Sequence, residues 1–180
     1  MNKGDWYFDS VIYNFKRGLM TGKTDTTFAP LENIARAQFA VILHRMGGKE
    51  PVEFTPVFPD VAEGVWYTDA VLWANGKRII TGYTNTGTFG PADNIIREQM
   101  AVMMYRYAQY KVMMQAVRFS PFEDASSVSG YAQEAMSWAV GTGIITGKYE
   151  GTRLDPQGNA LRAECAIIIR DLWIMKYFSR

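Results

Sequence analysis

The stretch NALRAECAII, residues 159–168, has two near copies earlier in the chain, NIARAQFAVI at 33–42 and NIIREQMAVM at 94–103. A second shared phrase precedes each copy, and it ends each time in the dipeptide Thr-Gly. The three phrases are RGLMTG ending at Gly22, KRIITG ending at Gly82 and GTGIITG ending at Gly147. The chain is therefore an internal triplicate, so each motif has to be interpreted as one of three copies.

The offsets between the copies fix an alignment. Arg97 follows Arg36 by 61 residues, and Arg162 follows Arg97 by 65. In this frame Cys165, the only cysteine, falls opposite Phe39 and Met100, which are apolar helix positions. We therefore expect Cys165 to be a small core residue and not a nucleophile.

Composition limits the classes of function. Of the 180 residues, 48% are hydrophobic and 21% are charged, as in an average globular domain that can build a core. The net charge of +1 gives no field that would attract nucleic acid or an anionic membrane, so a bound anion has to be captured locally. No apolar run approaches the roughly 20 residues that span a bilayer, so we expect no membrane insertion.

We expect one module over 1–180. Repeat one covers 1–50, a linker covers 51–57, repeat two covers 58–114 and repeat three covers 119–180. FPDV at 58–61 and FEDA at 122–125 open repeats two and three, and the equivalent of Phe58 in repeat one would fall before Met1. We therefore expect repeat one to be truncated, and the chain to be a fragment that lacks a signal peptide and a cargo domain.

Each repeat is predicted to contain two helices, so the fold class is all-α. The first helix is expected over 66–77, with counterparts at 6–17 and 131–142, because its apolar residues recur at steps of three and four. The second helix is expected to start near Asn33, Asn94 and Asn159. It is apolar over much of its circumference, which implies that the three copies are buried together at the centre.

The connection between the two helices is rich in turn residues. It ends in a bulky residue before x-Pro, which is Phe28, Phe89 or Leu154, and we interpret this residue as a plug that pins the loop to the core. His44 is expected to be structural, because no second histidine exists to build a metal site. The residues suggest no catalytic set, so we expect no enzyme activity, metal or cofactor.

The order of these motifs, a tryptophan-led helix, a GIITG-like turn, F-x-P and then x-R-A-E opening an apolar helix, resembles the S-layer homology (SLH) domain over essentially the whole chain. The resemblance implies three repeats in a pseudo-threefold, three-pronged arrangement around a central three-helix bundle. It also implies an extracellular module that anchors surface proteins of Gram-positive bacteria to the cell wall. The implied ligand is a secondary cell-wall polysaccharide bearing pyruvylated N-acetylmannosamine, bound in grooves between neighbouring repeats.

Residue chemistry fits such a ligand. A pyruvate ketal carries a carboxylate, which a planar guanidinium pairs with bidentately, and the first turn of a helix attracts anions through its backbone N–H groups. Aromatic rings are platforms for sugars, and glycines allow a ligand to approach the backbone. The alternative for the arginines is a solvated helix start. The candidate ligand-binding residues are Arg36, Arg97, Arg162, Trp6, Trp66, Tyr131, Gly22, Gly82, Gly147, Gln38, Gln99 and Glu164.

The sequence departs from the family at one register. The usual T-R-A-E is a capping box, and this chain replaces its threonine by Ala35, Ile96 and Leu161. We expect the fold to survive, with Asn33, Asn94 and Asn159 as alternative caps, and we expect the added bulk of Ile96 and Leu161 to weaken sugar binding in two grooves. Because Leu154 and Tyr131 replace Phe and Trp in repeat three, we also expect the grooves to be unequal.

A second function stays open. The altered grooves, with KVMMQAV at 111–117 and the tail WIMKYFSR at 173–180, could contact another protein or a second copy of the chain, without binding carbohydrate.

Overall fold

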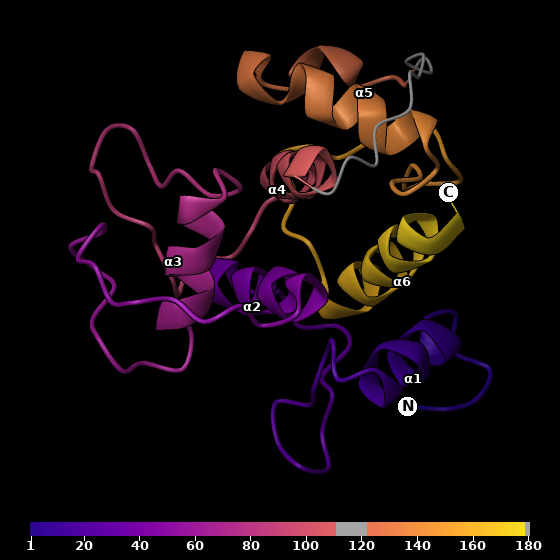
Figure 1. Ribbon diagram of the computed structural model, residues 1–180. Helices are drawn as coiled ribbons and strands as arrows, with labels where there is room; N and C mark the ends of the chain where they lie inside the picture. The colour runs from indigo at the N-terminus through magenta and orange to yellow at the C-terminus, as the bar shows by residue number, and fades with distance from the viewer. Residues whose placement is uncertain (111–121, 179–180) are drawn as a thin grey trace.

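The computed structural model describes residues 1–110 and 122–178, and the regular structure in these ranges is helical, which confirms the all-α class (Figure 1). Each repeat contributes two α-helices. They are α1 (Phe8–Lys16), α2 (Arg36–Gly47), α3 (Thr68–Gly76), α4 (Arg97–Tyr110), α5 (Gln133–Gly141) and α6 (Arg162–Phe178), with the short 3-10 helices η1 (Ala125–Ser127) and η2 (Gly130–Ala132) before α5.

The second helices begin later than predicted. They start at Arg36, Arg97 and Arg162, three residues after the asparagines. The prediction that the asparagines cap the helices is wrong, because they lie in extended segments that pair between repeats. The pairs are Asn33 with Leu161, Ala35 with Asn94, and Ile96 with Asn159.

A ring of backbone hydrogen bonds joins these extended segments. The amide of Ile34 donates to the carbonyl of Ala160, that of Ala160 to Ile95, and that of Ile95 to Ile34, each over 3.0 Å. All three residues are fully buried. The ring therefore links repeat one to three, three to two and two to one at the centre of the core.

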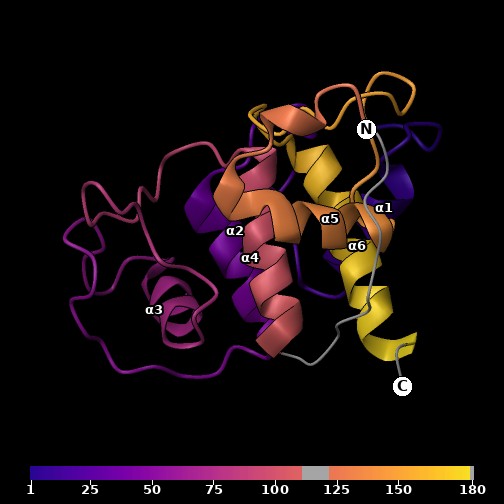
Figure 2. The ribbon, with the colours of Figure 1, turned by 90° about the horizontal axis from the view of Figure 1, so that it is seen from above.

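The helices pack in the same cyclic order. Each outer helix packs most closely on the inner helix of the preceding repeat, namely α3 on α2, α5 on α4 and α1 on α6. Figure 1 shows α2, α4 and α6 towards the middle with the outer helices around them, and Figure 2 shows α4 and α6 running in the same direction. A central bundle requires the three inner helices to pack on one another, whereas each of them packs most closely on an outer helix. The central three-helix bundle and the pseudo-threefold symmetry therefore remain predictions.

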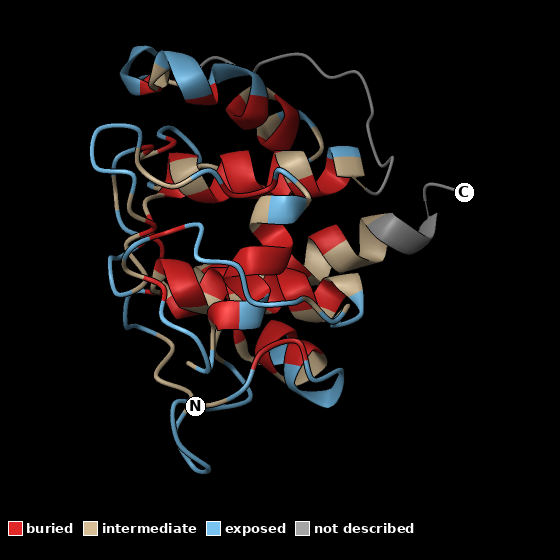
Figure 3. Cartoon of the chain, turned by 60° about the vertical axis from the view of Figure 1, so that its left-hand side comes forward, coloured by how far each residue is buried: buried red, intermediate tan, exposed pale blue. Residues whose placement is uncertain are grey.

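The core contains the residues expected of it. Cys165 is fully buried, as predicted. The plug residues Phe89 and Leu154 are also fully buried, which confirms the plug interpretation for repeats two and three, whereas Phe28 in repeat one is only partly buried. Burial raises the pKa of the Cys165 thiol to about 12, which leaves it unreactive. His44 packs against Trp73 at 5.1 Å between ring centroids, as a structural histidine does. Figure 3 shows this buried interior beneath exposed loops.

The aspartate of FPDV and the aspartate of FEDA hold the plug loops of repeats two and three. The carboxylate of Asp60 accepts from the amides of Phe89 and Gly90 at 2.8 and 2.7 Å. The carboxylate of Asp124 accepts from the amides of Leu154 and Asp155 at 2.7 and 2.8 Å. Each opening motif thus fixes the loop that carries the plug of its own repeat.

We predict that Gly82→Ala destabilises the fold by about 1–3 kcal/mol, because the new side chain would occupy a strained backbone conformation in a filled space. Gly82 has φ of +68°, and a Cβ there would lie 2.6 Å from Phe58 Cε1 and 2.7 Å from the carbonyl oxygen of Thr88. Chemical denaturation measures the change.

Gly76→Ala is the matched control. Gly76 lies on α3 with open space around its Cα, so alanine should be neutral or stabilise by up to about 1 kcal/mol. Equal effects of the two substitutions would contradict the assignment of Gly82 to a tight contact.

Candidate functional site: three grooves built from all three repeats

Three surface grooves lie between the repeats, and we name each by its arginine. The Arg36 groove has a volume of about 360 Å³, the Arg162 groove about 280 Å³ and the Arg97 groove about 260 Å³. Between them the grooves contain all twelve candidate residues, four in each. The Arg36 groove has Gly82, Gln99 and Tyr131, the Arg162 groove has Gly22, Gln38 and Trp66, and the Arg97 groove has Gly147, Glu164 and Trp6.

Each groove takes residues from three repeats, which differs from the expected two. In the Arg36 groove the arginine belongs to repeat one, Gly82 and Gln99 belong to repeat two, and Tyr131 belongs to repeat three. The other two grooves follow from this one by shifting each member to the next repeat. The cyclic packing explains this, because an outer helix crosses to the preceding inner helix and carries its leading aromatic residue with it.

The arginines tie neighbouring repeats together. The Nε of Arg36 donates to the carbonyl of Phe89 at 2.9 Å, that of Arg97 to Leu154 at 2.7 Å and that of Arg162 to Phe28 at 2.9 Å. Each acceptor is the plug residue of the next repeat. The guanidinium of Arg36 also stacks over the ring of Tyr83, 4.5 Å from its centroid.

The alternative of a solvated helix start is wrong for all three arginines. Their exposed fractions are only 3–4%, and burial lowers the pKa of each guanidinium from its ordinary value of 12.5. A buried cation needs polar partners to offset its desolvation. The carbonyls of the next repeat supply part of that compensation.

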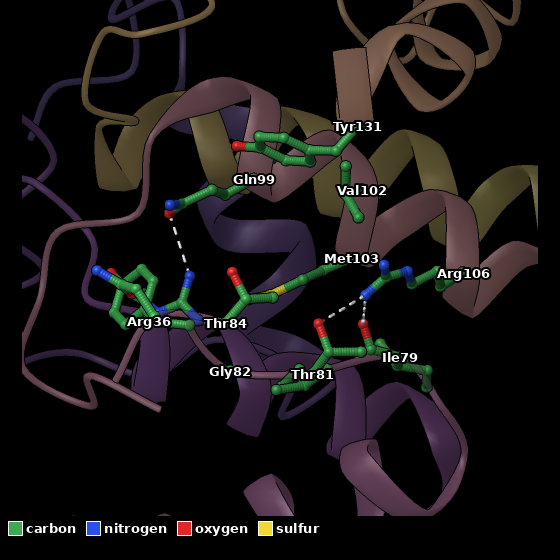
Figure 4. A pocket seen from close by; sticks show the side chains of 13 residues that line it. Arg36, Ile79, Thr81, Gly82, Thr84, Gln99, Val102, Met103, Arg106 and Tyr131 are labelled. Atoms are coloured by element: carbon green, nitrogen blue, oxygen red, sulfur yellow. Dashed lines mark hydrogen bonds between the residues drawn. The ribbon is translucent and has the colours of Figure 1, made fainter. Parts of the chain in front are cut away.

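One nitrogen of each guanidinium faces the third residue of the next inner helix. Nη1 of Arg36 donates to Gln99 Oε1 at 3.1 Å, and Nη1 of Arg162 donates to Gln38 Oε1 at 3.5 Å. Nη1 of Arg97 lies 3.6 Å from Glu164 Oε2. Figure 4 shows Arg36 and Gln99 joined in this way, with Tyr131 and Arg106 among the other side chains that line the pocket. This edge of the guanidinium lies on the groove lining.

The backbone amides of the first helical turn are less available than expected. The amides of Arg36 and Ala37 donate to the carbonyls of Asp93 and Pro91 in the next repeat, at 2.9 and 3.1 Å. The same two amides of α4 and α6 are used in the same way. These amides already donate hydrogen bonds to the next repeat, so they are not free to bind an anion as expected. The positive charge of each groove therefore comes from its side chains.

The aromatic residues at the groove rims are exposed. Trp6, Trp66 and Tyr131 have exposed fractions of 59%, 64% and 61%, although each has the helical spacing of a core residue. They precede the outer helices, which begin two residues after each of them. Large exposed aromatic rings beside buried cations are a feature of ligand-binding surfaces.

A buried carboxylate fixes Tyr131. Glu98 is 1% exposed, and it accepts from the amide and hydroxyl of Ser129 at 3.0 and 2.8 Å and from the Tyr131 hydroxyl at 2.7 Å. Burial and this carboxylate together raise the pKa of Tyr131. The sequence reasoning missed Glu98, although it replaces the alanine at the same register, Ala37 or Ala163, in the other repeats.

The substitutions at the threonine register lie outside the groove linings. Among the described residues, these linings do not include Ala35, Ile96 or Leu161, so the structure does not place their added bulk in the grooves. The expected weakening of sugar binding in two grooves stays a prediction. Half of the capping box survives in two repeats. Gln38 Oε1 accepts from the amide of Ala35 at 3.2 Å, and Glu164 Oε2 accepts from the amide of Leu161 at 3.0 Å.

Two further groove positions were missed. The residue after the Thr-Gly glycine lines each groove, as Lys23, Tyr83 or Lys148. The residue nine positions after each arginine lines two of them, as Arg45 and Arg106. Both positions recur at the repeat offset, so the alignment of the three copies contains the signal.

Other predicted features lie elsewhere. The segment KVMMQAV falls outside the described residues, as does the end of the tail WIMKYFSR, so a role in protein contact stays a prediction. No three His, Cys, Asp or Glu side chains come together as possible metal ligands in residues 1–110 and 122–178. In the same ranges, the helices are too short or too polar to cross a bilayer.

Glu98 should make stability depend on pH. Burial raises the pKa of its carboxyl, but the hydrogen bonds from Ser129 and Tyr131 outweigh burial, and the net pKa lies below the ordinary 4.5. Its stabilising contribution is therefore fully present above pH 4.5 and is lost as the pH falls through the lowered pKa.

We predict that Glu98→Gln lowers the free energy of unfolding by about 1–3 kcal/mol at pH 7, and that the deficit shrinks below pH 4.5. Denaturant titrations from pH 7 to pH 3 measure both effects, with the exposed Glu63→Gln as the control. A deficit that stays constant over this range would contradict the role assigned to the charged carboxylate.

Comparison with known proteins identifies the family. The sequence matches the S-layer homology domain over residues 1–40, 57–101 and 121–166, one match per repeat. It is 32% identical to an endoglucanase of Bacillus sp. (strain KSM-635), over 96% of this chain and 18% of that protein. It is 32% identical to an amylopullulanase of Thermoanaerobacterium thermosulfurigenes, over 94% of this chain and 9% of that protein. It is 28% identical to the S-layer protein EA1 of Bacillus anthracis, over 92% of this chain and 19% of that protein.

The chain thus spans less than a fifth of the length of these relatives, and the enzymes among them share only this small part with it. The shared part is a non-catalytic module that anchors proteins at the cell surface. With its three matched repeats, this chain belongs to the S-layer homology domain family.

Proposed function

We propose that the chain holds a larger protein on the bacterial cell wall by binding, in its grooves, a secondary wall polysaccharide that bears pyruvylated N-acetylmannosamine. One observation carries the proposal. Each groove combines a nearly buried guanidinium with a largely exposed aromatic ring at its rim.

The guanidinium supplies the site for the ligand's charge. A pyruvate ketal turns a neutral sugar into an anion, and the anion needs donors that are already oriented. The Nε bond to a plug carbonyl fixes the plane of each guanidinium, while Nη1 faces a groove-lining amide or carboxylate. Charge-assisted hydrogen bonds of this kind are shorter and stronger than neutral ones.

The aromatic ring and the glycine suit the sugar ring. The apolar face of a sugar can stack on Trp6, Trp66 or Tyr131, and Gly22, Gly82 and Gly147 line the same grooves. Groove volumes of about 260–360 Å³ lie at or just below the lower limit of the range for ligand pockets. A single sugar unit in each groove suits this size, so a polymer with repeated units could occupy several modules or grooves at once.

The relatives support anchoring as the biological role. They are an endoglucanase, an amylopullulanase and an S-layer protein, and all three share this module. An attachment function explains why one module accompanies such different proteins.

We predict that Trp66→Ala removes binding in the Arg162 groove, or weakens it by at least about tenfold, which is 1.4 kcal/mol. Because Trp66 is 64% exposed, the substitution should leave the melting temperature nearly unchanged, unlike substitution of a buried arginine. Calorimetric titration with a synthetic glycoside of pyruvylated N-acetylmannosamine measures the number of sites and their affinities.

Phe15→Ala is the matched control, because Phe15 is 60% exposed and lies on α1 outside the groove linings. It should leave the titration unchanged. If the folded wild-type protein does not bind the glycoside, or if both substitutions weaken binding equally, the proposed function is wrong.

A further inference from the structure

A stripe of side chains on one face of an inner helix lines each of the two larger grooves. The residues of a stripe are spaced by three and four, so they lie on the same face of the helix. The stripes are Gln99, Val102, Met103 and Arg106 on α4, and Gln38, Val41, Ile42 and Arg45 on α2. Each stripe therefore begins with an amide, continues with two apolar side chains and ends with an arginine.

The arginine at the end of the stripe is a second cation in its groove. Arg106 follows Gln99 by seven residues, which corresponds to about 10 Å along the helix axis. Gln99 is the residue that accepts from Nη1 of Arg36. The two guanidinium groups therefore lie at opposite ends of the Arg36 groove, and Figure 4 shows Met103 between them.

Arg45 and Arg106 are held in the same way. Nη1 of Arg45 donates to the carbonyl of Leu19 at 3.2 Å, and Nη1 of Arg106 donates to the carbonyl of Ile79 at 3.5 Å. Leu19 and Ile79 are equivalent, because each lies three residues before the glycine of the Thr-Gly turn. Nη1 of Arg106 also donates to the hydroxyl of Thr81 at 3.4 Å. Each guanidinium is thus fixed through one nitrogen.

Both guanidinium groups keep donors that the protein does not use. In residues 1–110 and 122–178, neither Arg45 nor Arg106 pairs with a carboxylate, and their Nε and Nη2 atoms donate no hydrogen bond to the protein. Lys23, which also lines the Arg162 groove, is different because it is paired with Glu32. The unused donors of the two arginines are therefore available to an acceptor of the ligand.

The surroundings of these donors match an acetamido group. Its carbonyl oxygen accepts hydrogen bonds, and its methyl group favours apolar neighbours. Apolar residues line both grooves together with the arginine, and they are Ile79, Val102 and Met103 in one and Met20, Val41 and Ile42 in the other. A hydroxyl group has no methyl to bury, and a second carboxylate would lose hydration beside these side chains.

The two ends of the groove also match the two ends of the sugar. A pyruvate ketal across O4 and O6 of N-acetylmannosamine closes a six-membered ring, whereas the acetamide is attached to C2 on the other side of the pyranose. If the carboxylate is bound by Arg36, the acetamide can extend along the stripe towards Arg106.

We propose that Arg106 and Arg45 are specificity-determining residues that bind the acetamide carbonyl of the sugar in the Arg36 and Arg162 grooves. This inference rests on the proposed function, because it takes the pyruvate carboxylate to be bound by the other arginine of each groove. The Arg97 groove lacks such a residue. Asp171 occupies the equivalent position, pairs with Arg170 at 2.8 Å and is not among the described residues that line this groove.

The test compares two glycosides by calorimetric titration, pyruvylated N-acetylmannosamine and pyruvylated mannose, in which a hydroxyl replaces the acetamide. Trp6→Ala with Trp66→Ala confines binding to the Arg36 groove, because these two rings line the other grooves. This protein should bind the acetylated glycoside at least about tenfold more tightly, as expected of one hydrogen bond to a charged group. Adding Arg106→Met should abolish the preference by weakening the acetylated glycoside alone.

Two controls accompany this comparison. Arg17→Met removes an exposed arginine outside the groove linings, and it should leave the tenfold preference unchanged. Trp66→Ala with Tyr131→Ala leaves the Arg97 groove, which should bind the two glycosides equally. A tenfold preference in that groove would overturn the inference, because it would arise without the second arginine.

Arg45 provides an independent test if the Arg106→Met protein does not melt cooperatively. Trp6→Ala with Tyr131→Ala leaves the Arg162 groove, and adding Arg45→Met there should again abolish the preference for the acetylated glycoside.

Equal binding of the two glycosides in the unaltered Arg36 groove would overturn the inference and leave the proposed function intact. An equal loss of both glycosides in a folded Arg106→Met protein would overturn it as well, since it would indicate a structural role or a contact with the carboxylate that both ligands share. Absence of binding of either glycoside by the wild-type protein, with a cooperative melt, would overturn the proposed function itself.

Discussion

The closed ring of backbone hydrogen bonds among Ile34, Ile95 and Ala160 is the constraint on which the other contacts depend. A buried backbone N–H or carbonyl has to find a partner, and in this chain each ring residue finds it in a different repeat. The ring places the starts of α2, α4 and α6 next to one another. It thereby brings each arginine within reach of the plug carbonyl of the next repeat.

Each arginine consequently has two roles, and substitution of the whole side chain would remove both at once. Nε binds the neighbouring repeat, while Nη1 faces the groove. Each guanidinium is only 3–4% exposed, and the loss of its hydration costs free energy. Polar neighbours therefore have to be in place around it before a ligand arrives. Such preorganisation suits the capture of one carboxylate by a protein whose net charge is only +1.

The sequence was sufficient for the repeats, the paired helices and the buried cysteine, and the twelve residues that it singled out all line the grooves, although their role in binding stays a prediction. These features recur at nearly fixed offsets. Comparison of the three copies therefore distinguishes residues that have the same role in every repeat from residues that occur in one repeat only. The helix starts were placed three residues early because asparagine is a common helix cap, and only the tertiary pairing shows that Asn33 lies in an extended segment. The exposure of Trp66 was not predictable either, because its helical spacing also fits a core position.

The origin of each groove in three repeats could not be predicted from one repeat. It depends on the crossing of α1, α3 and α5 to inner helices of other repeats, which is a property of the cyclic packing. Glu98 shows the same limit. A glutamate in the first turn of a helix usually faces solvent, yet here it is 1% exposed and holds Tyr131 of another repeat over the Arg36 groove. Local sequence contains the residue type, and only the assembled fold determines its partner.

Native-state hydrogen exchange at the amides of Ile34, Ile95 and Ala160 is the most direct test of the closed ring. If the ring unites the three repeats, the three amides should exchange with the same free energy, equal to that of global unfolding, and a destabilising substitution in any one repeat should lower all three equally. Three different exchange free energies that respond separately to substitutions in their own repeats would show that the repeats are independent units, and would contradict this account.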